Sequence, residues 1–184
     1  MTEVLIPLYE GVTHLDFTGP RQFLSTLTDF DVITASLDGD PMVSNGLTFS
    51  NLTDLETVER CGALPIPGDL GCIPAIENAR YKAAVRRLAE NATHLTSVCT
   101  GSLVLGATRL LKGRRASCHW AWRNLSSAIG ATADDARIVC DGNVLTGGGD
   151  CRHRLFARTQ RRNPRQGRCP VCPTPSRICS RTAA

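Results

Sequence analysis

The sequence lacks any apolar run close to the roughly 20 residues of a membrane-spanning helix, which excludes anchoring by such a helix. It also has no basic leader before the apolar residues 4–8, so we expect no signal peptide and a cytoplasmic protein. Hydrophobic residues make up 42% and charged residues 21%, a balance that excludes wholesale disorder, collagen and coiled coil. At 184 residues, the chain suits one domain that buries a core without disulfides.

Lysine is scarce, with two lysines against nineteen arginines, and the charges are unevenly spread. Residues 150–184 carry nine arginines and one acid, a net charge of +8, whereas residues 1–149 carry a net charge of −4. The nine cysteines divide at the same place, with four in the tail and five before it. We therefore expect a domain over residues 1–149 and a tail of different character over residues 150–184.

Short apolar runs alternate with helical patterns in residues 1–149, which is typical of a parallel α/β sheet. Strands are expected at residues 2–9, 31–35, 63–67, 94–98, 115–118 and 137–140, and a turn at 141–143 leads into residues 144–149. Helices are expected at residues 15–27, 77–90, 100–111 and 119–128. Asn45-Gly46 predicts the turn of a short hairpin arm. Pro65 fits poorly in a central strand because proline has no amide hydrogen to donate.

Cys99 lies where an apolar strand is expected to turn into a helix, with the small residues Ser97 and Gly101 on either side. A nucleophile elbow needs small flanking side chains, because its sharp turn exposes the central residue. A thiol at the N-terminus of a helix also experiences the positive end of the helix dipole, which lowers its pKa. The same pattern is equally typical of an inert, buried cysteine at a strand–helix junction.

Four ordered segments resemble the ThiJ/PfpI superfamily, which is related to the class I glutamine amidotransferases. They are residues 15–20 (LDFTGP), 99–107 (CTGSLVLGA), 116–121 (ASCHWA) and 141–149 (DGNVLTGGG). Within the superfamily they are most similar to the isocyanide hydratase branch. The resemblance covers residues 2–149 and implies a flavodoxin-like three-layer α/β sandwich with a mainly parallel sheet. It also implies a homodimer.

The resemblance implies catalytic roles for three residues. Cys99 stands at the position of the nucleophile, and Asp16 at that of the acid that hydrogen-bonds the thiol and passes a proton to a substrate carbon. Thr100 would orient the site through its hydroxyl and offer a backbone N–H. From the residues alone, Asp16 is also explained as the N-cap of a helix.

Substrate contacts are implied at Gly68, Asp69 and His119. Gly68 and Asp69 follow Pro67 where the family has Pro-Gly-Gly, so Asp69 departs from the pattern by adding a Cβ and a charge. Such a charge beside the thiol would raise its pKa, and a positive φ would suit Asp less well than Gly, so we expect reduced activity. His119 matches a histidine near the cysteine in relatives, although a His-Trp pair is often only packing.

The reaction implied by the resemblance is the addition of water to an isocyanide, which gives an N-substituted formamide through a thioimidate on Cys99. It needs no metal and no organic cofactor, and it involves no specific nucleic acid and no membrane. Two alternatives stay open. One is a ligand-sensing domain like that of some AraC-type transcription regulators. The other is a cysteine-based stress or redox protein, or one that handles glyoxals.

The resemblance ends after Gly149, where relatives continue into a long apolar helix that this chain is expected to lack. A permissible coding of residues 150–157, read one base out of register, spells Ile-Ala-Gly-Ile-Asp-Phe-Ser, which is similar to the family segment. We therefore hypothesise a shift of reading frame beside Gly149, with an out-of-frame or disordered tail. A zinc site around Cys169 and Cys172, and a basic patch that binds anions, are weaker alternatives.

Overall fold

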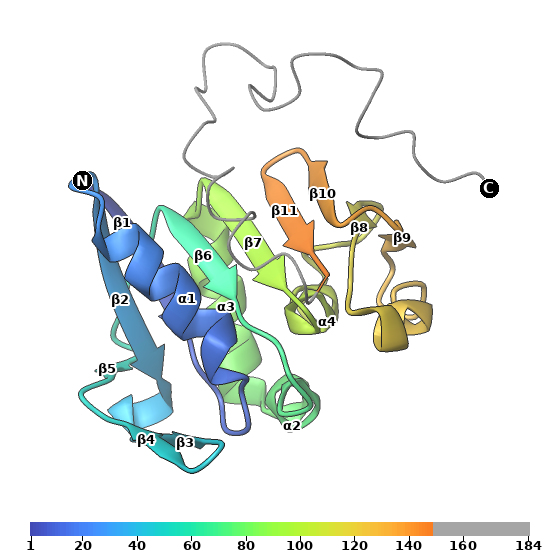
Figure 1. Cartoon of the computed structure of the whole chain (residues 1–184). Helices are drawn as coiled ribbons and strands as arrows, with labels where there is room; N and C mark the ends of the chain where they lie inside the picture. The colour runs from blue at the N-terminus through green and yellow to red at the C-terminus, as the bar shows by residue number, and fades with distance from the viewer. Residues whose placement is uncertain (149–184) are drawn as a thin grey trace.

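The computed structural model of the chain describes residues 1–148, and its centre is a seven-stranded sheet (Figure 1). The strand order is β10-β11-β7-β6-β1-β2-β5, with every neighbouring pair parallel except β10 and β11. The strands are β1 (Thr2–Pro7), β2 (Phe30–Ser36), β5 (Thr53–Asp54), β6 (Ala63–Ile66), β7 (His94–Val98), β10 (Ile138–Asp141) and β11 (Val144–Gly147). The helices are α1 (His14–Ser25), α2 (Cys72–Glu77), α3 (Ala79–Asn91) and α4 (Gly101–Ala107).

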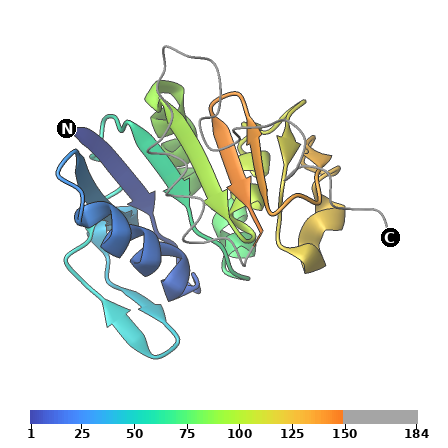
Figure 2. The same ribbon diagram turned by 45° about the horizontal axis from the view of Figure 1, so that its top comes forward.

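Helices cover both faces of the sheet. Figures 1 and 2 show α1 on one face and α3 on the other, so the molecule has three layers. All four residues of β6 and all four of β11 are buried, as expected of strands that are covered on both sides. The expected α/β sandwich with a mainly parallel sheet is confirmed. The expected loss of a C-terminal helix concerns residues 149–184, which lie outside the described part of the chain.

The order of the strands reverses between β1 and β6. From β1 the chain continues to β2 on one side, whereas from β6 it continues to β7 and β11 on the other. Open α/β sheets bind ligands at the carboxyl ends of the strands beside such a reversal, because the loops there diverge. The loops that follow β1, β6 and β7 are therefore the place to look for a site.

Pro65 lies within β6, in the centre of the sheet, contrary to the expectation that it fits poorly there. The ladder between β6 and β7 contains four residue pairs, but the ladder between β6 and β1 contains a single pair, Val4 with Ala63. Proline has no amide hydrogen, so a short ladder on one side is the form in which a central strand tolerates it. A backbone hydrogen bond from the N–H of Gly62 to the carbonyl of Glu3 adds to the contact with β1.

Several expected elements are shorter than their sequence patterns suggest. The helix expected at 100–111 ends at Ala107, and Arg109 takes a positive φ of 65° that no α-helix contains. The helix expected at 119–128 is a 3-10 helix, η2 (Trp120–Leu125). The strand expected at 115–118 is reduced to β8 (Arg115–Ala116), which pairs with β9 (Thr132–Ala133) in a separate small sheet.

Other expectations are confirmed to within a few residues. β7 has the expected bounds, and the hairpin at Asn45-Gly46 forms from β3 (Met42–Ser44) and β4 (Leu47–Phe49). The helix expected from residue 77 begins at Ala79, because the Asn78 side chain caps it by accepting from the backbone N–H groups of Arg80 and Tyr81. None of the helices in residues 1–148 has the length and apolar character needed to cross a bilayer.

Candidate functional site

Cys99 lies in a strained turn between β7 and α4. Its φ is +56°, a left-handed conformation that residues other than glycine seldom adopt. The turn is held at both of its backbone groups: the N–H of Cys99 donates to the carbonyl of Gly147 at 2.9 Å, and its carbonyl accepts from the N–H of His119 at 3.1 Å. The expected elbow is therefore present, and neighbouring segments fix the strained residue.

Two glycines allow the loop after β6 to pack against this elbow. A Cβ on Gly68 would lie 2.6 Å from the Cβ of Cys99 and 2.6 Å from the backbone nitrogen of Thr100. A Cβ on Gly101 would lie 2.3 Å from the carbonyl oxygen of Ile66. Both distances are below any normal contact, so each position requires glycine. The loop thus touches the cysteine itself.

Asp16 also contacts the loop that follows β6, at Gly68. It lies in the first turn of α1, where it is only 2% exposed. Its Oδ2 accepts a hydrogen bond from the N–H of Gly68 at 3.1 Å. Gly68 therefore contacts both the buried carboxyl of Asp16 and Cys99. The expectation that Asp16 is the N-cap of α1 is not met, since the N-cap is Thr13.

Thr100 fixes the loop through its hydroxyl. Oγ1 of Thr100 accepts from the N–H of Asp69 at 2.7 Å and donates to the carbonyl of Asp69 at 2.8 Å. The N–H of Asp69 is thus directed to the hydroxyl of Thr100. Thr100 itself is buried, so its hydroxyl stabilises the loop after β6 from within the protein.

Asp69 adopts a φ of +141°, which favours glycine, so the departure from Pro-Gly-Gly carries backbone strain. Its carboxylate accepts from the Thr13 hydroxyl at 2.5 Å and from the N–H of Leu70 at 2.5 Å. Each carboxylate oxygen therefore has a local partner beside the N-terminus of α1. These bonds are the compensation that the strained Asp69 receives in this chain.

His119 contacts the elbow with its backbone, through the N–H that donates to Cys99. Its side chain is engaged elsewhere, because Nδ1 accepts from the N–H of Ala121 at 3.3 Å and so caps η2. The ring packs on Trp120 with the centroids 5.4 Å apart. The structure therefore favours the packing interpretation for the imidazole and assigns the contact with the thiol site to the main chain.

Tyr9 belongs to the site, although no motif in the sequence pointed to it. Its hydroxyl donates to the carbonyl of Pro67 at 2.8 Å, which holds the residue just before Gly68. Tyr9 also lies within electrostatic reach of both Asp16 and Cys99. Burial raises the pKa of Tyr9 well above its usual value, so the phenol stays protonated and keeps donating. Its place just after β1, at the strand-order reversal, was the available signal.

Two further cysteines lie close to the elbow. Cys72 lies beside Thr100, and Cys118 lies beside Ser102; both thiols are buried. Burial raises the pKa of both thiols, and it raises the pKa of Cys61 to about 12. These three thiols are therefore protonated at neutral pH, which leaves them poor nucleophiles.

Large apolar side chains are exposed next to the thiol site. Leu15 is 42% exposed beside Asp16, Leu70 is 61% exposed beside Asp69, and Trp120 is 75% exposed beside His119. Each is the chain neighbour of one of the residues described above, so exposed apolar groups lie in the same loops as Asp16, Asp69 and His119. Exposed apolar groups of this kind mark binding surfaces more often than ordinary solvent-facing surface.

Metal ligands do not gather in the described region. Within residues 1–148, no group of three or more His, Cys, Asp or Glu side chains lies where it could hold a metal ion. The zinc alternative involved Cys169 and Cys172, which lie outside the described residues. The hypothesis of a shifted reading frame and the proposed tail of residues 150–184 also lie outside them.

Residues 2–160 match the DJ-1/PfpI family, so the match continues past Gly149. The chain is 41% identical over 143 residues to isonitrile hydratase from Pseudomonas putida, covering 77% of this chain and 63% of that protein. The chain thus spans less than two thirds of that relative's length. It is 34% identical over 101 residues to the HTH-type transcriptional regulator CdhR from Pseudomonas aeruginosa, covering 54% of this chain and 29% of the regulator.

Among solved structures, a ThiJ/PfpI family protein from Pseudomonas syringae superposes with a TM-score of 0.81 at 31% identity. The superposition covers 86% of this chain and 67% of that one. The family match extends over most of the chain, and the fold is the same. The chain therefore belongs to the DJ-1/PfpI family.

Proposed function

We propose that this member of the DJ-1/PfpI family hydrates isocyanides to N-substituted formamides, with Cys99 as the nucleophile. The observation that carries the proposal is the contact of one glycine, Gly68, with both the strained cysteine and the buried Asp16 carboxyl. The identity of 41% to an isonitrile hydratase supports the same reaction class.

The reaction begins when the Cys99 thiolate attacks the terminal carbon of the isocyanide and forms a C–S bond. The same carbon then takes a proton, which gives a thioimidate with one C–H bond and a C=N bond. Asp16 supplies this proton in the proposed scheme, because its carboxyl is buried against Gly68, the residue that also contacts Cys99.

Hydrolysis completes the cycle. Water adds to the thioimidate carbon, a proton passes to nitrogen, and the tetrahedral intermediate expels the Cys99 thiolate. The net change adds one water molecule across the isocyanide carbon and gives a formamide, with no change in the oxidation state of the protein. The reaction proceeds without a metal or an organic cofactor.

Thr100 and Tyr9 act as positioning residues in this scheme. Thr100 holds Asp69 through two hydrogen bonds, and Tyr9 holds the carbonyl of Pro67. Together they fix the loop on both sides of Gly68, so the distance between the acid and the thiol is set by a loop that has little freedom. Small errors in such a distance cost large factors in rate.

The exposed apolar side chains that adjoin the site residues in sequence suit an isocyanide with an apolar substituent. Leu15, Leu70 and Trp120 also offer a surface for a second copy of the chain, and a homodimer is part of the proposal. Sedimentation analysis tests it: a mass of twice that of the chain at micromolar concentration is expected, and a monomer contradicts it.

A ligand-sensing domain is the second candidate, because the chain resembles a transcriptional regulator over 101 residues. Such a domain would bind a small molecule without turnover. Activity decides between the two candidates, since a sensor that binds an isocyanide releases no formamide.

The deciding experiment incubates the full chain with n-butyl isocyanide in ¹⁸O-labelled water and measures N-butylformamide by mass spectrometry. We expect labelled product, a reduction of about 10³-fold or more in Cys99→Ser, and a strong reduction in Asp16→Asn. Cys140→Ser, which alters a half-buried cysteine on β10, is the matched control and should keep full activity. Product at the protein-free rate, or activity that survives Cys99→Ser, contradicts the proposal.

A further inference from the structure

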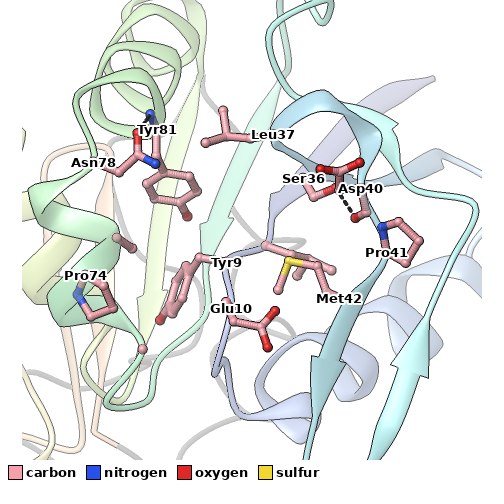
Figure 3. Close-up of a pocket in the computed structure, with 13 residues that line it drawn as sticks. Tyr9, Glu10, Ser36, Leu37, Asp40, Pro41, Met42, Pro74, Asn78 and Tyr81 are labelled. Carbon is pink, nitrogen blue, oxygen red and sulfur yellow. Dashed lines mark hydrogen bonds between the residues drawn. The ribbon is translucent and has the colours of Figure 1, made fainter.

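A cavity of about 360 Å³ lies beside the thiol site, at the carboxyl ends of β1 and β2 (Figure 3). One wall comes from α2 and the start of α3, and the other from the segment that joins β2 to β3. Its volume is at the lower end of the range for small-molecule sites. The residues used below are Tyr9, Glu10, Asp40, Met42, Asn78 and Tyr81.

The charged groups that line this cavity are both acidic. Glu10 follows β1 and Asp40 precedes β3, and both side chains are exposed at the rim. In Figure 3 the carboxylate of Glu10 lies between Tyr9 and Met42. Among residues 1–148, no lysine, arginine or histidine lines the cavity. The electrostatic potential inside is therefore negative, which repels anions and attracts cations.

The arginine that follows the cavity residue Asn78 in sequence does not offset this charge. Arg80 follows Asn78 by two residues, but its guanidinium is bound to the carboxylates of Asp38 and Glu56. The Asn78 side chain also has a structural role, because its oxygen caps α3. Glu10 and Asp40 therefore line the cavity without a basic residue among the described residues that line it.

The inner walls are aromatic and apolar. The rings of Tyr9 and Tyr81 pack edge to face with their centroids 5.7 Å apart, and Met42 lies opposite them. Both phenol hydroxyls donate inward, to the carbonyls of Pro67 and Pro7, so they present no donor to an anionic ligand. Aromatic rings and a thioether are favourable neighbours for an organic cation.

We propose that this cavity binds a small organic cation, an ammonium group on a short apolar chain. The ammonium lies at the rim between Glu10 and Asp40, and the apolar chain packs on Tyr9, Tyr81 and Met42. Neither Cys99 nor Asp16 lines the cavity, so the cation would not touch the reactive groups of the thiol site. Tyr9 belongs to both, which places the ligand in contact with a residue that positions the thiol site.

The test follows the methyl group of Met42 by NMR in protein labelled with [¹³C-methyl]methionine. The chain has two methionines, so the signal is assigned with Met42→Leu. The probes are n-butylammonium, n-butanol and butyrate, which differ in charge but share the apolar chain. We expect n-butylammonium to shift the Met42 signal with saturation in the millimolar range, and the other two to bind at least about fivefold more weakly.

Variants test whether the carboxylates of Glu10 and Asp40 attract the ammonium group. The double variant Glu10→Gln/Asp40→Asn should weaken n-butylammonium by at least about fivefold, because both changes remove a rim charge without removing volume. Glu59→Gln removes one exposed acid outside the cavity and should bind as the wild type does. Cys99→Ser should also bind unchanged. The proposal is overturned if no probe shifts Met42, if n-butanol binds as well as n-butylammonium, if the double variant retains full affinity, or if Cys99→Ser loses binding.

Discussion

The thiol site and the cation cavity share Tyr9 and are constructed in opposite ways. At the thiol site, Gly68 and Gly101 leave no space for a single Cβ, and two residues hold positive φ angles. At the cavity, about 360 Å³ is open and the charged groups reach it from exposed positions. The geometry of the thiol site is thus fixed by backbone contacts, whereas the proposed ligand binding at the cavity depends on the side chains that line it. Substitutions should therefore act by different routes in the two regions.

Gly68→Ala should have the largest effect. The added Cβ would meet the Cβ of Cys99 and the backbone of Thr100 at 2.6 Å, and backbone atoms cannot move aside cheaply. We expect a loss of about 3 kcal/mol or more in the free energy of unfolding and no turnover. Urea denaturation measures the first, and formamide release the second. Gly148→Ala is the control, because its nearest contact would be 3.6 Å, and it should change stability little.

Tyr9→Phe and Tyr81→Phe each remove a single oxygen atom, one at the thiol site and the other behind the cavity. Each change removes a phenol that donates to a backbone carbonyl, so each should cost about 1–2 kcal/mol of stability. Tyr9 holds Pro67, next to Gly68, and its loss should lower kcat several-fold. Tyr81 holds Pro7 behind the cavity, and its loss should leave kcat unchanged. Equal changes in kcat would contradict the division between the two regions.

The sequence predicted the thiol site in part because the required features are local. Ser97, Cys99 and Gly101 indicate an elbow by their spacing, and the departure at Asp69 from the family pattern coincides with a positive φ. The roles of Tyr9 and Thr13 were not predicted, since they depend on which loops meet at the carboxyl edge. Such meetings are set by the order of the strands, which no local pattern encodes.

The segment after α4 shows the other limit of prediction. Residues 119–128 have a helical pattern, yet only a 3-10 helix forms there, whose start is capped by the imidazole of His119 and joined to Cys99 by the His119 N–H. Likewise, the helix pattern continues past Ala107, whereas the chain turns at Arg109. Tertiary contacts override helix propensity in both cases.

Asp69→Gly should have a smaller and opposite effect. Glycine adopts a φ of +141° without the strain of a Cβ, so we expect the free energy of unfolding to rise by about 1 kcal/mol. Asp69→Ala is the matched control, because it keeps the strain and loses the bonds to Thr13 and Leu70, and it should lower stability. Urea denaturation distinguishes them. If both variants are destabilised, the carboxylate bonds outweigh the strain.

Arg80→Gln should have the smallest effect. It should lower the Tm slightly and leave kcat unchanged, because Arg80 lies near the cavity and not at the thiol site. Arg80 joins the start of α3 to Asp38 and Glu56, but all three side chains are 40–54% exposed, and such pairs contribute little. Hydrogen bonds from Arg80 lower the pKa of both carboxyls, so the contribution is complete above their ordinary values of about 4 and is lost as the pH falls through the lowered values. The difference in Tm between wild type and Arg80→Gln should be small at pH 7 and vanish in stronger acid. Since salt screens exposed charges, it should also shrink in about 1 M NaCl, while kcat stays unchanged. A Tm difference that persists in acid would show that the arginine acts by packing its aliphatic stem rather than by its charge.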